Sequence, residues 1–396
     1  MAPPGIYIHV PFCASICRYC NFNRVLFDPV LKERYVAALE RDIRKTGSRL
    51  DAGRHPLDGP FPPLSLSSPD TLYFGGGTPS LLEPWEVRRL IVACRDALGL
   101  CSDAEVTLEA NPETVTAASM AGFREAGVNR VSLGVQSFNA DELERLGRTH
   151  TAARAVEALA EIRASGLGNI SLDLMMWLPG QSVEDWQKSL ERLTGLAPAH
   201  ASLYMLELYP NSPLREEMAR GGLGLPPDEV ACDMYEAAID TLAASGYEHY
   251  EISNFAMPGR RSRHNMKYWT DGDWFGFGCG AHSTIDGVRW KSVSATLDYV
   301  EAVAAGRPVA AEVRRLTAQE RLEEALFMRL RLVEGVDLRE MRLHYAVDVL
   351  ERYRERLSEA FDAGLVLLDG DVLRLTRRGL LLSNEVMAVF IDSRVR

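Results

Sequence analysis

The stretch GIYIHVPFCASICRYC, residues 5–20, opens the first structural unit of this chain. Its first six residues form an apolar run that predicts a β-strand. Cys13, Cys17 and Cys20 follow directly, and three thiolates on one short loop can converge on a metal centre. A four-iron cluster with three protein ligands keeps one iron open to a small molecule. Structural zinc remains an alternative, with His9 on the preceding strand, although zinc usually takes four ligands.

Working outward from this stretch, five more apolar runs alternate with amphipathic segments of helical period. The expected strands after the first are Thr71–Phe74, Val106–Ala110, Arg130–Val135, Ile170–Met175 and Ala201–Leu206. The expected helices are residues 30–46, 83–98, 116–126, 151–164 and 183–193, with further helical turns from Asp141. Six strand–helix units in series predict an α/β fold with a parallel sheet. We expect a partial (β/α)6 barrel with its active residues at the C-terminal strand ends.

The chain divides into three expected regions. Residues 1–226 form the barrel, and the Pro- and Ser-rich segment 54–69 within them is expected to be a surface loop. Residues 227–312 extend the barrel and carry an aromatic, basic segment. Residues 313–396 form a mostly helical C-terminal domain, with helices at 317–333 and 348–362 and a final helix from Thr376. Two short strands around Asp369-Gly370-Asp371 predict a hairpin and a winged-helix-like domain. A bare packing appendage is the alternative.

Composition narrows the function further. The 396 residues are 46% hydrophobic and 25% charged, which is typical of a globular protein. A net charge of −11 argues against a nucleic-acid-binding role. We expect no transmembrane segment and no signal peptide. The seven cysteines, three of them crowded near the start, favour a metal site in a reducing compartment, and therefore a cytoplasmic protein.

Polar residues recur near the same end of successive expected strands. The Gly-rich turn Gly75–Pro79 follows the second strand, Glu109 and Gln136 end the third and fourth, and Asp173 lies in the fifth. Glycines let backbone approach a ligand closely, and Arg148 can hold a carboxylate by two hydrogen bonds. Each residue alone is better explained as a satisfied polar group. Together they favour a ligand pocket at the C-terminal strand ends.

The cysteine triad after Tyr-Ile-His-Val-Pro-Phe resembles the radical S-adenosylmethionine (SAM) superfamily, and within it the HemN/HemW group, over nearly the whole chain. The resemblance implies a 4Fe–4S cluster on Cys13, Cys17 and Cys20 and a low-potential electron donor. It also implies that SAM binds the open iron and is cleaved to methionine and a 5′-deoxyadenosyl radical. Implied contacts to one or two SAM molecules are Tyr7, Tyr19, Gly76, Gly77, Thr78, Glu109, Gln136, Arg148 and Asp173. Glu207 matches loosely, and Trp177 stands where a glycine is more usual.

A second candidate site is the segment His264-Asn265-x2-Tyr268-Trp269, which follows Arg260, Arg261 and Arg263. A neutral imidazole can ligate heme iron, arginines suit propionates, and Tyr and Trp offer flat apolar faces. On chemistry alone, an ordered loop with a hydrogen-bonded histidine is an equally good explanation. Cys279 and His282 are weaker candidates for heme contact. Cys94, Cys101 and Cys232 are expected to be packing residues.

The HNxxYW pattern resembles the heme-binding members of this group. It implies heme as a cofactor with His264 as its ligand, heme-accepting proteins as partners, and a heme chaperone as the function. The alternative is an oxygen-independent coproporphyrinogen III oxidase of porphyrin biosynthesis, which uses SAM to decarboxylate two propionates. That enzyme carries a further cysteine where this chain has Phe22, and a longer N-terminal arm. Both departures argue against the decarboxylase.

Overall fold

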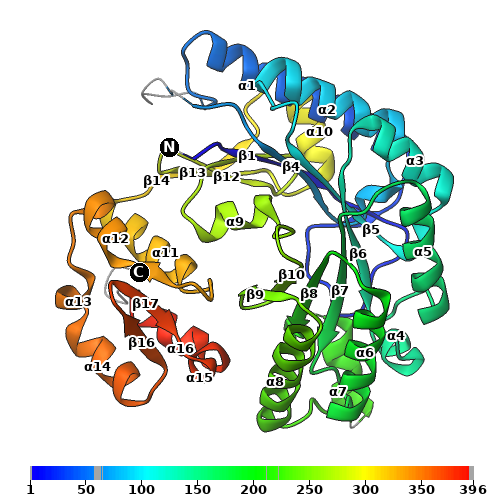
Figure 1. Ribbon diagram of the computed structural model, residues 1–396. Helices are drawn as coiled ribbons and strands as arrows, with labels where there is room; N and C mark the ends of the chain where they lie inside the picture. Colours follow the sequence, from blue (N-terminus) through cyan, green and yellow to red (C-terminus); the bar gives the residue numbers. More distant parts are fainter. Residues whose placement is uncertain (1, 58–63, 65, 211, 222, 392–396) are drawn as a thin grey trace.

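Six parallel strands, neighbours in chain order, form the centre of the sheet in this computed structural model (Figure 1). They are β1 (Gly5–Val10), β4 (Thr71–Gly76), β5 (Glu105–Ala110), β6 (Arg130–Gln136), β7 (Ile170–Met176) and β8 (His200–Met205). The structure describes residues 2–57, 64, 66–210, 212–221 and 223–391. All six predicted strands are confirmed. The predicted loop at 54–69 lies partly outside the described residues.

The helices that connect these strands lie outside the curve of the sheet (Figure 1). They are α1 (Pro29–Asp51), α2 (Pro84–Leu98), α3 (Ala117–Ala126), α4 (Ala140–Arg145), α5 (Ala152–Ala164) and α6 (Val183–Leu196). Local sequence fixes their ends. The Asp28 side chain accepts from the first backbone N–H groups of α1, and Gly99 ends α2 at φ +68°.

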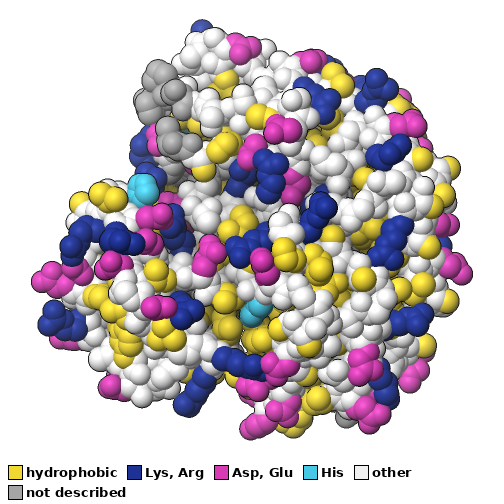
Figure 2. All heavy atoms as spheres, in the orientation of Figure 1, with side chains coloured by type: hydrophobic (Ala, Val, Ile, Leu, Met, Phe, Trp, Pro, Cys, Tyr) yellow, Lys and Arg dark blue, Asp and Glu magenta, His cyan; other side chains and the backbone are white. Residues whose placement is uncertain are grey.

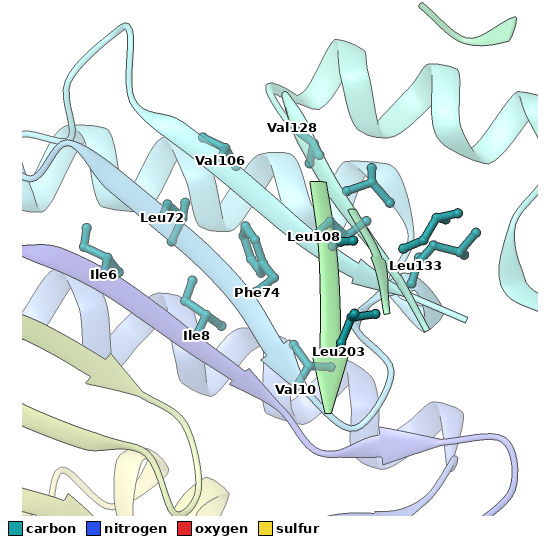
Figure 3. Packing of buried hydrophobic residues seen from close by; sticks show 14 of the residues in the cluster. Ile6, Ile8, Val10, Leu72, Phe74, Val106, Leu108, Val128, Leu133 and Leu203 are labelled. Atoms are coloured by element: carbon teal, nitrogen blue, oxygen red, sulfur yellow. The ribbon is translucent and has the colours of Figure 1, made fainter. Parts of the chain in front are cut away.

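Alternation along the strands separates the core from the interior of the barrel. Ile6 and Ile8 of β1 and Leu72 and Phe74 of β4 are fully buried, and they pack with Leu108 and Leu133 of the next strands (Figure 3). The intervening strand positions face the other side of the sheet. They carry the tyrosines, serines and carboxylates that build the site described below.

Within the described residues, strands on both edges widen this sheet to twelve, in an arrangement that the sequence did not predict. The added strands are β9 (Glu248–Glu251), β10 (Asn254–Ala256), β11 (Trp274–Phe277), β12 (His282–Ile285), β13 (Val288–Ser292) and β14 (Ala310–Arg315). Strand β11 pairs parallel with β1, and β12 to β14 continue as an antiparallel meander. Strands β10 and β9 pair antiparallel beyond β8. The strand order runs from β14 to β9 without closing, so the barrel is partial, as predicted.

Three helices belong to this extension, α8 (Asp228–Ala244), α9 (Arg263–Trp269) and α10 (Thr296–Ala304), and α7 (Pro213–Gly221) precedes them. Helix α9 lies on the inner side of the curved sheet, between the barrel strands and the C-terminal helices (Figure 1). Among the described residues, no helix is long and apolar enough to cross a membrane.

The C-terminal region forms its own small sheet, in the order β15-β17-β16. Its elements are α11 (Ala318–Arg329), β15 (Val336–Asp337), α12 (Leu338–Tyr345), α13 (Val349–Arg352), α14 (Arg354–Asp362), β16 (Val366–Asp369), β17 (Val372–Leu375), α15 (Arg377–Leu381) and α16 (Ser383–Ala388). The predicted hairpin is confirmed. The single helix predicted at 348–362 was wrong, because the backbone leaves helical geometry at Tyr353. Strand β14 continues the large sheet to Arg315, two residues past the predicted domain start.

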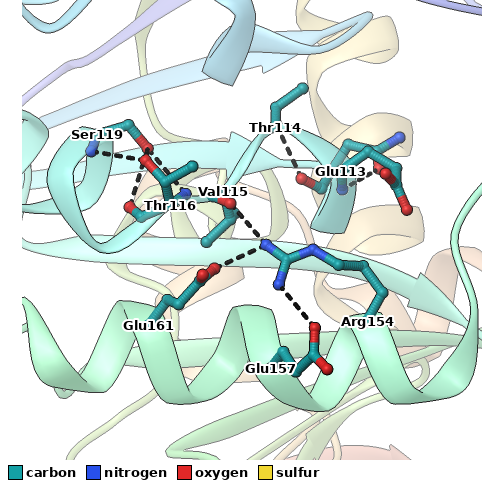
Figure 4. A network of polar contacts seen from close by, with 9 residues as sticks. Glu113, Thr114, Val115, Thr116, Ser119, Arg154, Glu157 and Glu161 are labelled. Carbon is teal, nitrogen blue, oxygen red and sulfur yellow. Dashed lines mark hydrogen bonds and ion pairs between the residues drawn. The ribbon is translucent and has the colours of Figure 1, made fainter.

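Polar contacts on the outside of the barrel fix neighbouring units to each other (Figure 4). Arg154 of α5 donates to the carbonyl of Val115, at 2.6 Å, and pairs with Glu161 at 2.7 Å. Val115 directly precedes Thr116, whose side chain forms a capping box with Ser119 at the start of α3. The arginine therefore holds the loop before α3 against α5.

Candidate functional site

The cysteine loop projects from the C-terminal end of β1. A two-residue strand, β2 (Phe12–Cys13), pairs parallel with β3 (Val25–Leu26). The end of the cysteine loop therefore lies beside its beginning. The N–H of Phe27 donates to the carbonyl of Cys13, at 2.9 Å, and closes the base of the loop. All three cysteines are thereby held over the same end of the barrel.

The three thiols line a single pocket. The Thr78 hydroxyl donates to Cys13 Sγ at 3.7 Å, and Arg148 Nη1 donates to Cys17 Sγ at 3.5 Å. Burial raises the pKa of the Cys13 and Cys20 thiols, and bound metal reverses this effect because a coordinated thiol loses its proton. Among the described residues, no three His, Cys, Asp or Glu side chains form a cage for one ion. Three thiols spread around one pocket suit a four-iron cluster, which is larger than a single ion.

His9 does not join the cysteines as a fourth ligand. Its Nε2 lies 2.7 Å from the carbonyl oxygen of Asn23, and its Nδ1 lies 3.1 Å from the Tyr7 hydroxyl. Burial lowers the pKa of His9, so the ring is neutral. This histidine fastens the end of the cysteine loop to β1, and both of its nitrogens are occupied. The zinc alternative therefore loses the ligand that the sequence offered it.

A cavity of about 320 Å³ opens beside the cysteine loop at the C-terminal strand ends. Its walls include every predicted cluster or SAM residue except Tyr7. Those lining residues are Cys13, Cys17, Tyr19, Cys20, Gly76, Gly77, Thr78, Glu109, Gln136, Arg148 and Asp173. The loosely matched Glu207 also lines the cavity.

The Gly-rich turn passes close to the cysteine loop. Gly76 has φ +117°, and a Cβ there would meet the His9 ring at 2.6 Å. A Cβ at Gly77 would meet the carbonyl oxygen of Phe12 at 2.7 Å. The glycines are therefore required by contact with this chain's own loop, in addition to the predicted approach to a ligand. They bring the backbone of the turn and Thr78 up to the cluster ligands.

Glu109 is a carboxyl group held deep in the barrel. The Tyr73 hydroxyl donates to its Oε1 at 2.9 Å, and the Gly76 N–H donates to its Oε2 at 3.0 Å. Burial raises the pKa of Glu109 to about 7, and the Asp173 carboxylate adds to that rise, while the two donors oppose it. This carboxyl therefore titrates near neutral pH.

Asp173 sits in a cradle of serine hydroxyls that the sequence analysis missed. Ser132 donates to both carboxylate oxygens, at 3.0 and 2.9 Å, and Ser171 donates to Oδ1 at 3.0 Å. Ser202 is the register partner of Asp173 on β8. Burial raises the pKa of Asp173, and the serine hydrogen bonds oppose that rise. These serines alternate with buried apolar residues along adjacent strands, so they face the same side of the sheet as Asp173. This alternation was the signal in the sequence that could have identified them.

Arg148 connects the cysteine loop to the barrel wall. Its Nη2 donates to the carbonyl of Gly134 at 2.6 Å, while its Nη1 reaches Cys17. Burial alone would lower the pKa of the Arg148 guanidinium, but Tyr19 and Cys17 raise it above its usual value. Its buried Nε has no hydrogen-bond partner among the described residues. An unpaired donor on a charged group can bind an incoming carboxylate or hydroxyl.

Two strand ends carry non-glycine residues in the left-handed region. Gln136 has φ +68°, where β6 makes a register shift against β7. Trp177 has φ +60°, and its indole donates to the carbonyl of Pro226 at 2.8 Å. Strain of this kind collects where surrounding structure fixes a residue for function. It is consistent with a ligand-contacting role for Gln136, while Trp177 fastens the segment after α7.

Two predicted residues lie away from this cavity. Tyr7 is one layer below it, stacked on Tyr73 at a ring distance of 6.2 Å. His264 is 1% exposed, and its Nδ1 and Nε2 lie 2.9 Å from the Thr71 and Tyr268 hydroxyls. Burial lowers the pKa of His264 to about 3. In this conformation neither nitrogen is open to an iron, so the geometry argues against His264 as a heme ligand.

Two of the three predicted arginines, Arg261 and Arg263, are also engaged. Arg263 pairs with Asp70 at 2.9 Å, and Arg261 pairs with Glu334 at 3.0 Å. Cys279 is buried, 3.5 Å from the Tyr35 hydroxyl, and Cys94 is buried within α2. Arg261, Arg263 and Cys279 hold the extension in place, whereas Cys94 packs in the barrel core.

Comparisons with known proteins agree with this architecture. A model of the radical SAM superfamily matches residues 67–193, and a model of the HemN C-terminal domain matches residues 316–382. The heme chaperone HemW of Bacillus subtilis is 35% identical, and the match covers 97% of this chain and 98% of that protein. The heme chaperone HemW of Escherichia coli is 34% identical over 99% of both chains. This chain belongs to the HemW family of radical SAM proteins.

The fold also matches a solved structure, that of coproporphyrinogen III oxidase (HemN) from Escherichia coli, a radical SAM enzyme. The TM-score is 0.82 with 23% sequence identity, over 99% of this chain and 90% of the other. At this identity the match shows a shared fold. Membership of the HemW family and of the superfamily implies a 4Fe–4S cluster and SAM as cofactors. The predicted family and fold are confirmed.

Proposed function

We propose that Cys13, Cys17 and Cys20 hold the 4Fe–4S cluster and that SAM occupies the adjacent cavity. The support is geometric, because the three thiols and the polar residues of four strands, β5 to β8, border one space of about 320 Å³. When bound, the cluster supplies a low-potential electron for cleavage of SAM, and a separate electron donor must reduce it. Thr78 and Arg148 orient the Cys13 and Cys17 thiols through the hydrogen bonds described above.

We assign the polar contacts to SAM on the same grounds. Glu109 and Asp173 present carboxylate oxygens that can accept from its ammonium or hydroxyl groups, and Arg148 presents an unpaired donor for its carboxylate. Gln136 and the turn at Gly76 and Gly77 border the same space. Tyr7 has an indirect role: its hydroxyl hydrogen-bonds to His9, and His9 in turn hydrogen-bonds to the backbone at the end of the cysteine loop.

We infer that the chain is a heme chaperone, which binds heme and delivers it to acceptor proteins. The observation that carries this inference is the full-length match to relatives named heme chaperone HemW. Phe22 adds support, because the residue at the position of the decarboxylase's further cysteine is an apolar side chain, 61% exposed at the cavity rim. We therefore place coproporphyrinogen III oxidation second.

Heme transfer tests this function. The chain, reconstituted anaerobically with iron and sulfide, is titrated with hemin and then mixed with an apo heme protein that has a distinct Soret band. We expect stoichiometric hemin binding, followed by a shift of the Soret band to that of the acceptor at a rate above that of free hemin. Absence of any hemin binding would contradict the proposed function.

A further inference from the structure

A second cavity, also of about 320 Å³, lies between α9, the start of β11 and β12, and α11 of the C-terminal region. It shares no lining residue with the cavity at the cysteine loop. Tyr268 and Trp269 of α9 form one wall, Trp274 and His282 come from the strands, and Met328 comes from α11. We call this space the α9–α11 cleft.

His282 is the open histidine of this cleft. Of the eight histidines in the chain, all within the described ranges, His282 and His344 alone are exposed. No hydrogen bond joins the His282 ring to another described residue, since its one contact is the backbone carbonyl, which accepts from the Trp274 indole at 2.9 Å. A neutral, unpaired imidazole is the form that ligates iron.

The walls of the cleft are aromatic and already ordered. Tyr268 and Trp274 meet edge to face at 4.8 Å between ring centres. The Arg331 guanidinium lies over the Trp269 ring, 4.4 Å from its centre, and donates to Glu251 at 3.0 Å. The Trp269 indole N–H is buried without a hydrogen-bond partner among the described residues. Flat faces of this kind suit a planar apolar ligand, and the indole N–H offers it one donor.

Among the described residues that line the cleft, one arginine side chain makes no hydrogen bond or ion pair. Arg289 is occupied by Glu324, through two hydrogen bonds of 2.9 and 2.7 Å. Asp271 accepts from Tyr345, and burial raises the pKa of Asp273 to about 6. No hydrogen bond or ion pair within the described ranges involves the Arg321 guanidinium, which can therefore take a carboxylate. Figure 2 shows positive and negative side chains interspersed over the visible face of the molecule.

We propose that the α9–α11 cleft is the heme site, in which His282 ligates the iron and Arg321 pairs with a propionate. The inference rests on the proposed function and adds the location of the cargo. It assigns the aromatic residues of the HNxxYW segment to the wall of the cleft. It assigns His264 to the interior, where its hydrogen bond to Tyr268 positions that wall.

The location separates the cargo from the radical chemistry. Trp274 is the register partner of Gly5, the first residue of β1, whereas the cysteine loop follows the last residue of that strand. A strand of six residues at ~3.3 Å each places the two sites about 20 Å apart. A radical formed at the cluster therefore cannot reach heme in the cleft. Heme bound there is carried without being a substrate.

The test is a hemin titration of the full chain, monitored by the Soret band. We expect His282→Ala to lose the histidine-coordinated spectrum and to bind hemin roughly tenfold more weakly or worse. Added imidazole should restore the spectrum, because it can fill the vacated position. His344→Ala is the matched control, since it removes the other exposed histidine outside the cleft, and it should bind hemin as the parent chain does. The cluster absorbance and SAM affinity should be unchanged in both variants.

Arg321→Ala gives a second measurement. We expect weaker hemin binding with a normal coordinated spectrum, because a propionate contact is lost while the iron ligand stays. Parent-like affinity and spectrum in His282→Ala would overturn the cleft while leaving the proposed function intact. An equal loss in His344→Ala would overturn it in the same way. Failure of the unmodified chain to bind hemin would overturn both the cleft and the proposed function.

Discussion

Replacing Glu109 by Gln separates charge from shape at the SAM cavity. The carboxyl has a pKa of about 7 because burial outweighs the hydrogen bonds from Tyr73 and Gly76. As the pH falls through 7, the Glu109 carboxylate takes up a proton, and the ionised fraction of this group decreases. If ionised Glu109 accepts from SAM, SAM affinity must decrease in the same range.

The size of the effect follows from the titration. A group with this pKa is about half ionised at pH 7 and about one-tenth ionised at pH 6. SAM affinity should therefore fall roughly fivefold between these two values, which is about 1 kcal/mol. The Glu109→Gln variant keeps the size of the side chain, but the amide cannot ionise. The part of the pH dependence of SAM affinity that comes from Glu109 should therefore disappear. Asp173 also has a raised pKa, and any slope left in Glu109→Gln belongs to that residue.

Equilibrium dialysis of labelled SAM against the anaerobically reconstituted chain, at pH 6 and pH 7, measures the ratio directly. Measurement at or below pH 7 avoids titration of the α-amino group of SAM, whose class has a pKa near 8. The comparison of parent and Glu109→Gln isolates the contribution of Glu109. Equal pH ratios in the two proteins would refute an ionised Glu109 in SAM binding.

Three further predictions concern the cluster, the arginine and the buried histidine. Replacing Cys13, Cys17 and Cys20 together by Ala should abolish the brown, air-sensitive chromophore, and iron that remains stoichiometric in the triple variant would contradict the assignment. Arg148→Ala should weaken SAM binding by about 1.5–3 kcal/mol, the range for hydrogen bonds to charged groups; an unchanged dissociation constant on an intact cluster would exclude the proposed contact. His264→Ala should lower the free energy of unfolding by about 1–3 kcal/mol, because it leaves the hydroxyls of Thr71 and Tyr268 unpaired in the core. Normal stability in urea, together with loss of heme coordination, would instead return the ligand role to His264.

The central strands could be predicted because their apolar runs are continuous and separated by long helices of clear period. Glu109, Gln136 and Asp173 followed from that pattern, since parallel strands bring their C-terminal ends to one edge. The serines around Asp173 were missed because a lone Ser in a strand carries no signal until the strand pairing is known. Once β6, β7 and β8 are aligned, Ser132 and Ser202 fall beside the carboxylate.

The extension was harder to predict for physical reasons. Strands β11 and β12 have four residues each, and β11 contains a glycine among its aromatic side chains. Strand β11 pairs with β1, more than two hundred residues away in the sequence, and β12 pairs with β13 across a tight turn. Pairing, and not local propensity, decides such strands. The role of His264 was also hard to predict from local sequence. Its aromatic and basic neighbours in the sequence suggested a histidine that is open to a ligand. Only the packing of α9 inside the barrel shows that both ring nitrogens are used.

The most direct test of the central claim assays one preparation for two activities. The reconstituted chain, with SAM and a low-potential reductant, is given coproporphyrinogen III in one reaction and hemin followed by an apo heme protein in the other. The heme chaperone account predicts heme binding and transfer, with no decarboxylated porphyrinogen. Steady decarboxylation with matching release of methionine, and no heme bound under any condition, would contradict it.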